Sequence, residues 1–406
     1  MNKNRPFRIY LLQCSATKLS QRAPAKNLYS SPLFSKSLAA AASDSNGAIY
    51  ILSALHGLVH LDTELDPYDV TLNGMKPADK KIWAARVASQ LQQLDARNAE
   101  IVMLAGKAYS SPIDVFINEH FGRVFYPLKN LGIGRRLAWL GIALRGGIRL
   151  AVDLEDFYQQ LYRLSTELGA VARLPELALR KDLPQRGVYF FMEPGELRMT
   201  GQLRVVRVGT HAVSAGSKAT LRSRLRTHLG TVAGSGSHRS SVFRRHVGVA
   251  IARRDGAELP VTWGREQTAT PSVIDTERWL ENSVSSFMAS TKVTWLKISD
   301  ESGPESDRAF IERNAIALLV HGAFLNEPSC SWLGKWSDRP SIVKYGIWNV
   351  DHTDVDYDPR FINIFAQYVD RALTAGTNSL SGELDASIAP PGWRAWKDAA
   401  ERPTLW

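Results

Sequence analysis

Short apolar runs alternate with stretches of helical periodicity in the first third of the chain. Residues 7–12, 48–54 and 100–106 are apolar runs of strand length. Between the last two, residues 80–94 place their apolar positions on one face of a helix: Ile82, Trp83, Val87, Leu91 and Leu94. Strands separated by helices predict a covered parallel sheet, in which ligands bind beyond the carboxyl ends of the strands.

The pattern changes after residue 150. An amphipathic helix and a loop are predicted over residues 151–183, which would link two domains. Two strands follow, at 187–191 and 204–209, with a turn expected at Pro194-Gly195. The later helical stretches are 219–229, 241–251 and 306–321.

These elements predict a fold of class α/β plus α+β. The expected parts are an N-terminal parallel-sheet α/β domain (1–150), a helical linker (151–183) and a C-terminal domain (184–406) with a small mixed sheet flanked by helices. A chain of 406 residues is long enough for two domains.

Composition and charge narrow the class of protein. The chain lacks an apolar run of 18 residues and a secretory h-region at its start, and it contains only two cysteines, so a cytoplasmic location is expected. The net charge of +10 is concentrated in residues 1–150 (19 basic against 10 acidic) and 184–260 (13 against 4). Two basic blocks favour a polyanionic partner such as nucleic acid, although a basic surface made for solubility has the same composition.

The second basic block carries a distinctive order of residues. Gly187-Val188-Tyr189 and Arg207-Val208-Gly209 lie on the two predicted strands, and the basic helix 219–229 follows them. This order resembles the GIY-YIG endonucleases, and the Arg-and-His helix resembles their restriction-enzyme branch. The resemblance implies a catalytic set of Tyr189, Arg207, Arg224, His228, Glu312 and Asn326, with Gly209 as the second-motif glycine and Glu312 as the metal ligand.

Phosphodiester hydrolysis needs the same kinds of group. It requires an activated water, a cation near the developing charge and help for the departing oxygen. Arg224 and His228 are four residues apart, so both project from one helix face. A single carboxylate at Glu312 suits a hydrated Mg²⁺ or Mn²⁺ ion.

Arg207 departs from the family pattern, because it stands where the second-motif tyrosine is usual. It either contacts the phosphate itself, or the domain binds without cutting. Each residue also has an ordinary structural interpretation: a strand aromatic for Tyr189, a solvated basic face for the arginine helix, and the start of a surface helix for Glu312.

Further basic residues surround this set. The helix and the Gly/Ser-rich loop after it predict nucleic-acid contacts through Arg222, Arg226, His238, Arg239, Arg244 and Arg245, although a mobile surface loop has the same composition. The aspartates after Asn349 fit no metal-ligand spacing, and residues 344–352 are interpreted as a structural cap over the sheet.

The first domain holds a second constellation near its strand ends. Its motifs lie at residues 14–18, 52–59, 66–69 and 105–109. They resemble, distantly, those of YaaA-like and nucleobase-handling proteins over residues 7–142, which implies a pocket and base recognition. The predicted pocket residues are Cys14, Ser15, Lys18, Ser53, His56, Asp66, Tyr68 and Tyr109. The carboxylate of Asp66 could assist N-glycosidic cleavage, and aromatic rings could stack on an extruded base. A buried cysteine, a core histidine and an ordinary turn are the alternatives.

Together these features predict a metal-dependent endonuclease directed at modified or foreign DNA, for restriction or phage defence, with an N-terminal domain that recognises or excises a base. The expected partner is DNA, and a homodimer is left open. Two alternatives remain: an N-terminal base glycosylase with a DNA-gripping second domain, and a non-catalytic nucleic-acid-binding protein.

Overall fold

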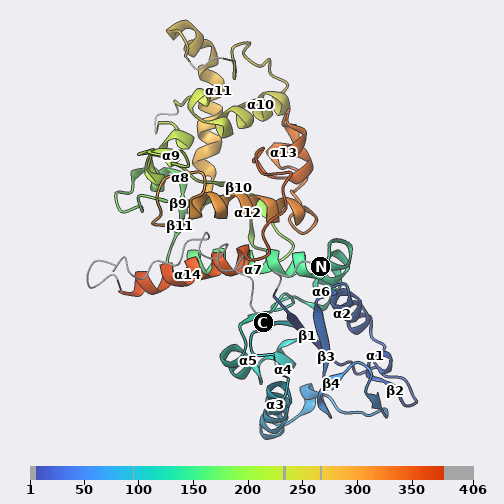
Figure 1. Cartoon of the computed structure of the whole chain (residues 1–406). Helices are drawn as coiled ribbons and strands as arrows, with labels where there is room; N and C mark the ends of the chain where they lie inside the picture. The colour runs from blue at the N-terminus through green and yellow to red at the C-terminus, as the bar shows by residue number, and fades with distance from the viewer. Residues whose placement is uncertain (1–5, 95, 232–234, 266–267, 379–406) are drawn as a thin grey trace. The chain divides into compact units, whose positions relative to one another are not determined.

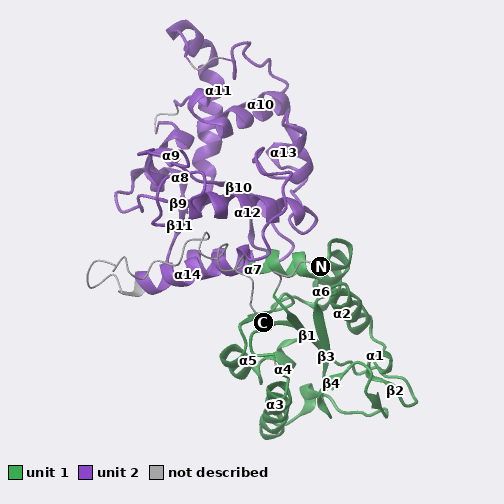
Figure 2. Ribbon diagram, in the orientation of Figure 1, with its two compact units in different colours: residues 1–156 green, residues 157–406 purple. Residues whose placement is uncertain are grey.

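The computed structural model describes residues 6–94, 96–231, 235–265 and 268–378. The chain divides into two compact units, Met1–Asp156 and Phe157–Trp406 (Figure 2). Helix α7 (Ile148–Thr166) runs across the boundary, so the segment 151–183 is shared between the units and differs from a separate linker. Among the described residues, no helix is both long and apolar enough to span a bilayer.

The first unit is an α/β fold around a five-stranded sheet of order β4-β3-β1-β6-β7 (Figure 1). The central strands β1, β3 and β6 correspond to the three predicted apolar runs. They pair in parallel, as do β6 and β7, whereas β4 is an antiparallel edge strand. The strands are β1 Arg8–Gln13, β2 Ala23–Pro24, β3 Gly47–Ser53, β4 Gly57–His60, β5 Glu64–Leu65, β6 Glu100–Leu104 and β7 Arg123–Phe125.

Every residue of β6 is buried, as expected for an interior parallel strand with both faces covered. Helices α2 and α6 pack against each other beside this sheet. The helices of the unit are α1 Ala25–Leu28, α2 Pro32–Ala42, η1 Leu72–Gly74, α3 Pro77–Gln92, α4 Lys107–Ser110, α5 Asp114–His120 and α6 Ile133–Gly146.

The second unit is built on a four-stranded sheet of order β10-β9-β11-β8. All its pairings are antiparallel, whereas a mixed sheet was predicted. The strands are β8 Val171–Arg173, β9 Gly187–Leu197, β10 Leu203–Gly209 and β11 Lys292–Lys297. The helices are α8 Leu174–Leu179, α9 Leu221–Leu229, η2 His238–Ser240, α10 Val242–Asp255, α11 Pro271–Ser290, α12 Asp307–His321, η3 Ala323–Leu325, η4 Leu333–Trp336, α13 Pro340–Tyr345 and α14 Phe361–Asn378.

Strand β9 separates two aromatic layers, because successive side chains of a strand point to opposite faces. On one face, Phe191 packs edge-on against His228 and Phe243, which belong to α9 and α10. On the other, Phe190 packs edge-on against Phe157 and against Phe365 of α14. The face that carries Tyr189 and Phe191 is therefore the one that meets the basic helix.

The hairpin between β9 and β10 corrects the turn predicted at Pro194-Gly195. Strand β9 continues through both residues to Leu197, and the chain turns over residues 198–202, where Gly201 has a φ of 87°. The β9–β10 register shifts twice between Leu203 and Arg207, so Pro194 lies in a bulge. A bulge tolerates proline because the missing N–H is not needed there.

The segment after α13 covers the outer edge of the second sheet, in agreement with the cap predicted there. The Trp348 backbone N–H donates to Val206 at 2.7 Å. The Asn349 side chain accepts from the Val208 N–H at 3.0 Å and donates to the Val208 carbonyl at 2.9 Å. These bonds satisfy backbone groups of β10 that an edge strand would otherwise expose.

Candidate active site

The centre of the candidate site is a buried hydrogen-bonded row of three side chains. The Tyr189 hydroxyl lies 2.9 Å from Nε2 of His228, and Nδ1 of the same ring lies 2.8 Å from Oγ of Ser241. Tyr189 comes from β9, His228 from the last turn of α9, and Ser241 is the N-cap of α10. All three are buried, so strand and helices hold them rigidly.

Gly209 leaves the space that the Tyr189 ring occupies. A Cβ atom at residue 209 would lie 2.5 Å from the Tyr189 ring and hydroxyl, well inside van der Waals contact. Its φ angle is not positive, so the requirement for glycine is steric. The second-motif glycine is thus explained by the tyrosine of the first motif.

We therefore expect Gly209→Ala to destabilise the protein by about 1–3 kcal/mol, because the added methyl group overpacks a rigid core. Urea denaturation measures the change. Gly303→Ala is the matched control, since nothing lies within 4 Å of a Cβ built there and its φ is not positive; its effect should stay within about 0.5 kcal/mol. Equal effects of the two substitutions would contradict the steric explanation.

A carboxylate and two arginines adjoin the buried row. Glu312, on α12, accepts a hydrogen bond from the Thr210 backbone N–H at 3.1 Å. Arg207 donates to the Trp348 carbonyl at 3.1 Å and lies over the Phe243 ring at 4.8 Å. Arg207, Arg224 and Glu312 are partly exposed, unlike Tyr189 and His228.

Burial sets the charge state of the cluster. It raises the pKa of Glu312 to about 7, an effect that Arg207, the Thr210 N–H and Arg224 oppose. It also lowers the pKa of His228 well below its usual value, and the neighbouring arginines act in the same direction, so the ring is neutral at pH 7. Burial raises the pKa of Tyr189, whereas the positive charges of Arg224 and Arg207 lower it.

Arg207 is a poorly satisfied cation. Its Nε atom is buried and has no hydrogen-bond partner among the described residues. Burial lowers the pKa of Arg207, while Tyr189, Glu312 and Asp351 favour its charge. A buried donor without a partner is costly and marks a place where a ligand group can bind.

Asn326 corrects the predicted catalytic set. Its Oδ1 accepts from the Tyr158 hydroxyl at 2.6 Å, and that hydroxyl in turn accepts from the Val205 N–H at 2.9 Å. Its bonds therefore run to the middle of β10, and among the described residues no hydrogen bond joins it to Glu312 or Tyr189. Ser241 and Thr210, which do contact the cluster, were not predicted.

Three of the predicted nucleic-acid-binding residues are internal. His238 stacks on Trp263 with 3.8 Å between ring centroids and lies 3.0 Å from Glu281. Arg239 is paired with Glu277 at 2.5 and 2.9 Å, and Arg244 with Glu281 at 2.5 Å. Their charged groups already contact the carboxylates of Glu277 and Glu281 on α11. These contacts correct the prediction that the three residues bind DNA. Arg222, Arg226 and Arg245 keep partial or full exposure, and their role stays a prediction.

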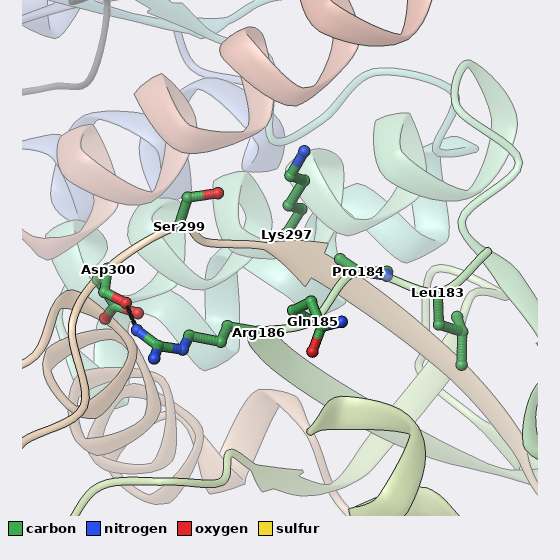
Figure 3. A pocket seen from close by; sticks show the side chains of 7 residues that line it. All are labelled: Leu183, Pro184, Gln185, Arg186, Lys297, Ser299 and Asp300. Atoms are coloured by element: carbon green, nitrogen blue, oxygen red, sulfur yellow. Dashed lines mark hydrogen bonds between the residues drawn. The ribbon is translucent and has the colours of Figure 1, made fainter. Parts of the chain in front are cut away.

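Two hollows lie close to the ends of these elements. One, of about 670 Å³, is lined by residues 183–186 before β9, by Lys297 at the end of β11 and by Ser299 and Asp300 after it. Figure 3 shows the Arg186 guanidinium reaching Asp300, to whose carbonyl it donates, while Lys297 extends away from them. The other hollow, of about 410 Å³, is lined by Ser223, Arg226, Thr227, Gly230, Ser237 and Ser240.

In the first unit, several predicted pocket residues meet beyond the carboxyl ends of β1, β3 and β6. The Tyr68 hydroxyl lies 2.7 Å from Ser53 Oγ and 2.8 Å from the Tyr29 hydroxyl, and Lys18 Nζ lies 4.3 Å from the centre of the Tyr68 ring. Cys14 Sγ lies 3.2 Å from the Tyr109 hydroxyl. Burial raises the pKa of Tyr68, so its hydroxyl is protonated at pH 7.

The remaining predicted pocket residues differ in their surroundings. His56 is exposed, but its ring packs edge-on against Tyr68 and its backbone N–H donates to Ser53 Oγ at 3.0 Å. Ser15 donates to the Thr17 carbonyl at 2.6 Å, within its own turn. Asp66 is exposed, and in the part of the chain that the structure describes no hydrogen bond joins it to the cluster. The cluster is therefore mainly aromatic and hydroxyl-bearing.

Glu312 brings a carboxylate to the cluster of the second unit, and carboxylate oxygens are ligands of Mg²⁺. Among the described residues, no group of three or more His, Cys, Asp or Glu side chains could hold a metal ion. The carboxylate of Glu312 costs free energy when ionised beside β10, and a divalent cation would relieve that cost. Mg²⁺ commonly binds through one or two carboxylates and keeps several waters.

Comparisons with known proteins show that two family models match separate parts of the chain. A family model described as GIY-YIG domain matches residues 149–375, more than half of the chain, and a family of unknown function, DUF6884, matches residues 9–142. Because the function of that second family is unknown, it gives no support to the resemblance to YaaA-like proteins. No curated protein and no solved structure matches the chain.

Proposed function

The chain belongs to the GIY-YIG domain family, and from this premise we propose that it is a metal-dependent endonuclease that hydrolyses phosphodiester bonds in DNA. One observation carries the proposal: Tyr189, Arg207, Arg224, His228 and Glu312 converge on one end of the second sheet. Arg207 gives the site a cation where the tyrosine of the second motif is usual, and a guanidinium there suits a phosphate oxygen.

Each residue has a chemical role in this proposal. As the phenolate, after release of its own proton, Tyr189 accepts a proton from the attacking water, and His228 holds the Tyr189 oxygen in place. Arg207 and Arg224 bind the non-bridging oxygens, on which charge develops in the transition state. Glu312 would hold Mg²⁺ or Mn²⁺, and the ion would supply further stabilisation of charge at the phosphate.

The exposed basic residues near the site are suited to bind the DNA backbone on either side of the cut. Lys297 borders the larger hollow and Arg226 the smaller one, and each is exposed. Phosphate contacts of this kind position a nucleic acid without reading its sequence. We therefore assign the two hollows to backbone phosphates on either side of the cut.

The first unit supports a role in choosing the substrate. Its row of tyrosines with Lys18 offers a stacking surface and neutral hydrogen-bonding groups, which suit a base. We propose that it recognises a modified base, so that the whole chain restricts modified or foreign DNA such as that of phages.

Incubation of the purified chain with plain and base-modified phage DNA, with Mg²⁺ or with EDTA, tests this function. We expect cleavage of modified DNA with Mg²⁺ and loss of cleavage with EDTA, because the Glu312 site would then be without its cation. Tyr68→Ala should reduce the preference for modified DNA and leave the cutting of plain DNA unchanged.

Other results would contradict the proposal. Alkali-labile breaks without direct cutting would transfer the chemistry to the first unit. Binding without either kind of break would leave a DNA-binding protein. Equal cutting with EDTA would overturn the dependence on a metal.

A further inference from the structure

Ser241 occupies a position between two elements of the candidate site. It is fully buried, and its Oγ accepts a hydrogen bond from the Arg244 backbone N–H at 3.3 Å as the N-cap of α10. The same oxygen lies 2.8 Å from Nδ1 of His228, whose Nε2 lies 2.9 Å from the Tyr189 hydroxyl. One serine thus contacts both the start of α10 and the histidine beside the proposed general base.

The direction of these hydrogen bonds follows from the donors available. The neutral His228 ring carries a proton on one nitrogen only. Ser241 Oγ already accepts from the helix, and its own proton has His228 Nδ1 as the acceptor seen among the described residues. If Nδ1 carried the proton instead, the buried serine hydroxyl would have no acceptor among the described residues, which is unfavourable.

We infer that Ser241 is a positioning residue that fixes His228 in the Nε2–H tautomer, so that His228 donates to the Tyr189 oxygen. The inference rests on the proposed function for its consequence in catalysis. With His228 as donor, the Tyr189 oxygen is prepared to carry negative charge, and its own proton is directed away from the histidine. His228 therefore supports Tyr189 as a base and does not deprotonate it.

The charged residues around His228 and Tyr189 favour the same direction of the hydrogen bond, from His228 to the Tyr189 oxygen. Arg224 on α9 and Arg207 on β10 face both rings, Arg244 on α10 faces His228, and Glu312 on α12 faces Tyr189. Three arginines disfavour a second proton on His228. The two that face Tyr189 favour a phenolate there, against the opposing charge of Glu312.

Ser241→Gly tests the inference, because glycine keeps most of the capping preference while the change removes the hydroxymethyl group that contacts His228. We expect kcat for DNA cleavage to fall at least about tenfold with little change in KM, and the ascending limb of the pH–rate profile to move to higher pH. Thr270→Gly is the control: Thr270 caps α11 in the same way and should leave both unchanged.

A second measurement does not depend on cleavage. Nitrogen-15 NMR of the full chain labelled at histidine reports the tautomer of His228. We expect the Nε2–H form in the natural protein and a mixture in Ser241→Gly. An Nδ1–H form in the natural protein would overturn the inference. If the tautomer is as inferred but no DNA is cut, the proposed function fails and the assignment of Ser241 stands.

Discussion

Glu312→Gln is expected to end DNA cleavage and, at pH 8, to make the folded chain more stable. Loss of the only proposed metal ligand should lower kcat by at least about a hundredfold, because charge on the phosphate would no longer be offset. The gain in stability has a separate origin. An ionised carboxylate at this position is unfavourable, and glutamine is never ionised.

The sign follows from the direction of the pKa shift. The pKa of Glu312 is raised from 4.5 to about 7, so the folded state binds the proton more tightly than the unfolded state. The stability associated with this proton is complete below pH 4.5 and is lost as pH rises through 7. At pH 8 the loss is roughly 2 kcal/mol, after allowance for the partial exposure of the side chain.

Urea denaturation in EDTA at pH 4.5 and pH 8 measures this effect. Glu312→Gln should match the natural protein at pH 4.5 and exceed it by roughly 2 kcal/mol at pH 8. Equal shifts at both pH values would show that the gain has nothing to do with ionisation. The experiment is done without metal, because a bound cation would favour the ionised carboxylate.

Glu193→Gln provides the matched control. Burial raises the pKa of Glu193 to about 7 as well, and its Oε1 accepts from the indoles of Trp348 at 2.6 Å and Trp332 at 3.2 Å. A glutamine oxygen can accept the same bonds. This variant should therefore gain stability at pH 8 and keep its cleavage activity. The comparison separates the effect of a buried ionised carboxylate on stability from the role of Glu312 in cleavage.

The residues that local patterns predict best are those whose role depends on their own segment. The three apolar runs form β1, β3 and β6, because interior parallel strands need continuous apolar sequence. Tyr189, Arg224 and His228 were named from short motifs, and the structure brings them together because β9 and α9 each carry their motif on one face.

The residues that were missed or misassigned depend on distant partners. Arg244 lies in a basic, hydroxyl-rich stretch typical of a DNA-binding loop, but Glu281, 37 positions later, draws it into the core. Ser241 has no motif to mark it, since its meaning comes from His228 on another helix. Pro194-Gly195 has the composition of a turn, and only the register of β9 against β10 shows it to be a bulge.

Arg207→Met is expected to lower kcat for DNA cleavage by about 10²–10³-fold without unfolding the chain. The guanidinium has a buried Nε without a partner among the described residues and a lowered pKa, so this part of it is available to an anion. Loss of one pre-positioned donor at a developing charge commonly has an effect of this size. Methionine fills a similar volume, so the fold should be retained.

Two further variants define what Arg207 does. Arg207→Lys keeps the charge but loses the planar fork, so it should retain part of the activity. Arg207→Tyr restores the family's second-motif tyrosine; if the arginine is the phosphate-binding group, this variant should be about as slow as Arg207→Met. A natural rate in Arg207→Tyr would contradict that role and show that the position serves as a tyrosine does elsewhere in the family.

The control is a buried arginine outside the site. Arg198 lies over the Tyr158 ring at 3.9 Å and donates to Gln202 at 2.8 Å, in the turn between β9 and β10. Arg198→Met should therefore lower the free energy of unfolding and leave kcat unchanged, the reverse of the pattern expected at Arg207. Single-turnover cleavage and urea denaturation of the same preparations distinguish the two patterns, because the first measures the rate of cleavage and the second measures the free energy of unfolding. Opposite outcomes at the two arginines would show that the charge at residue 207 is retained for catalysis, at some expense of stability.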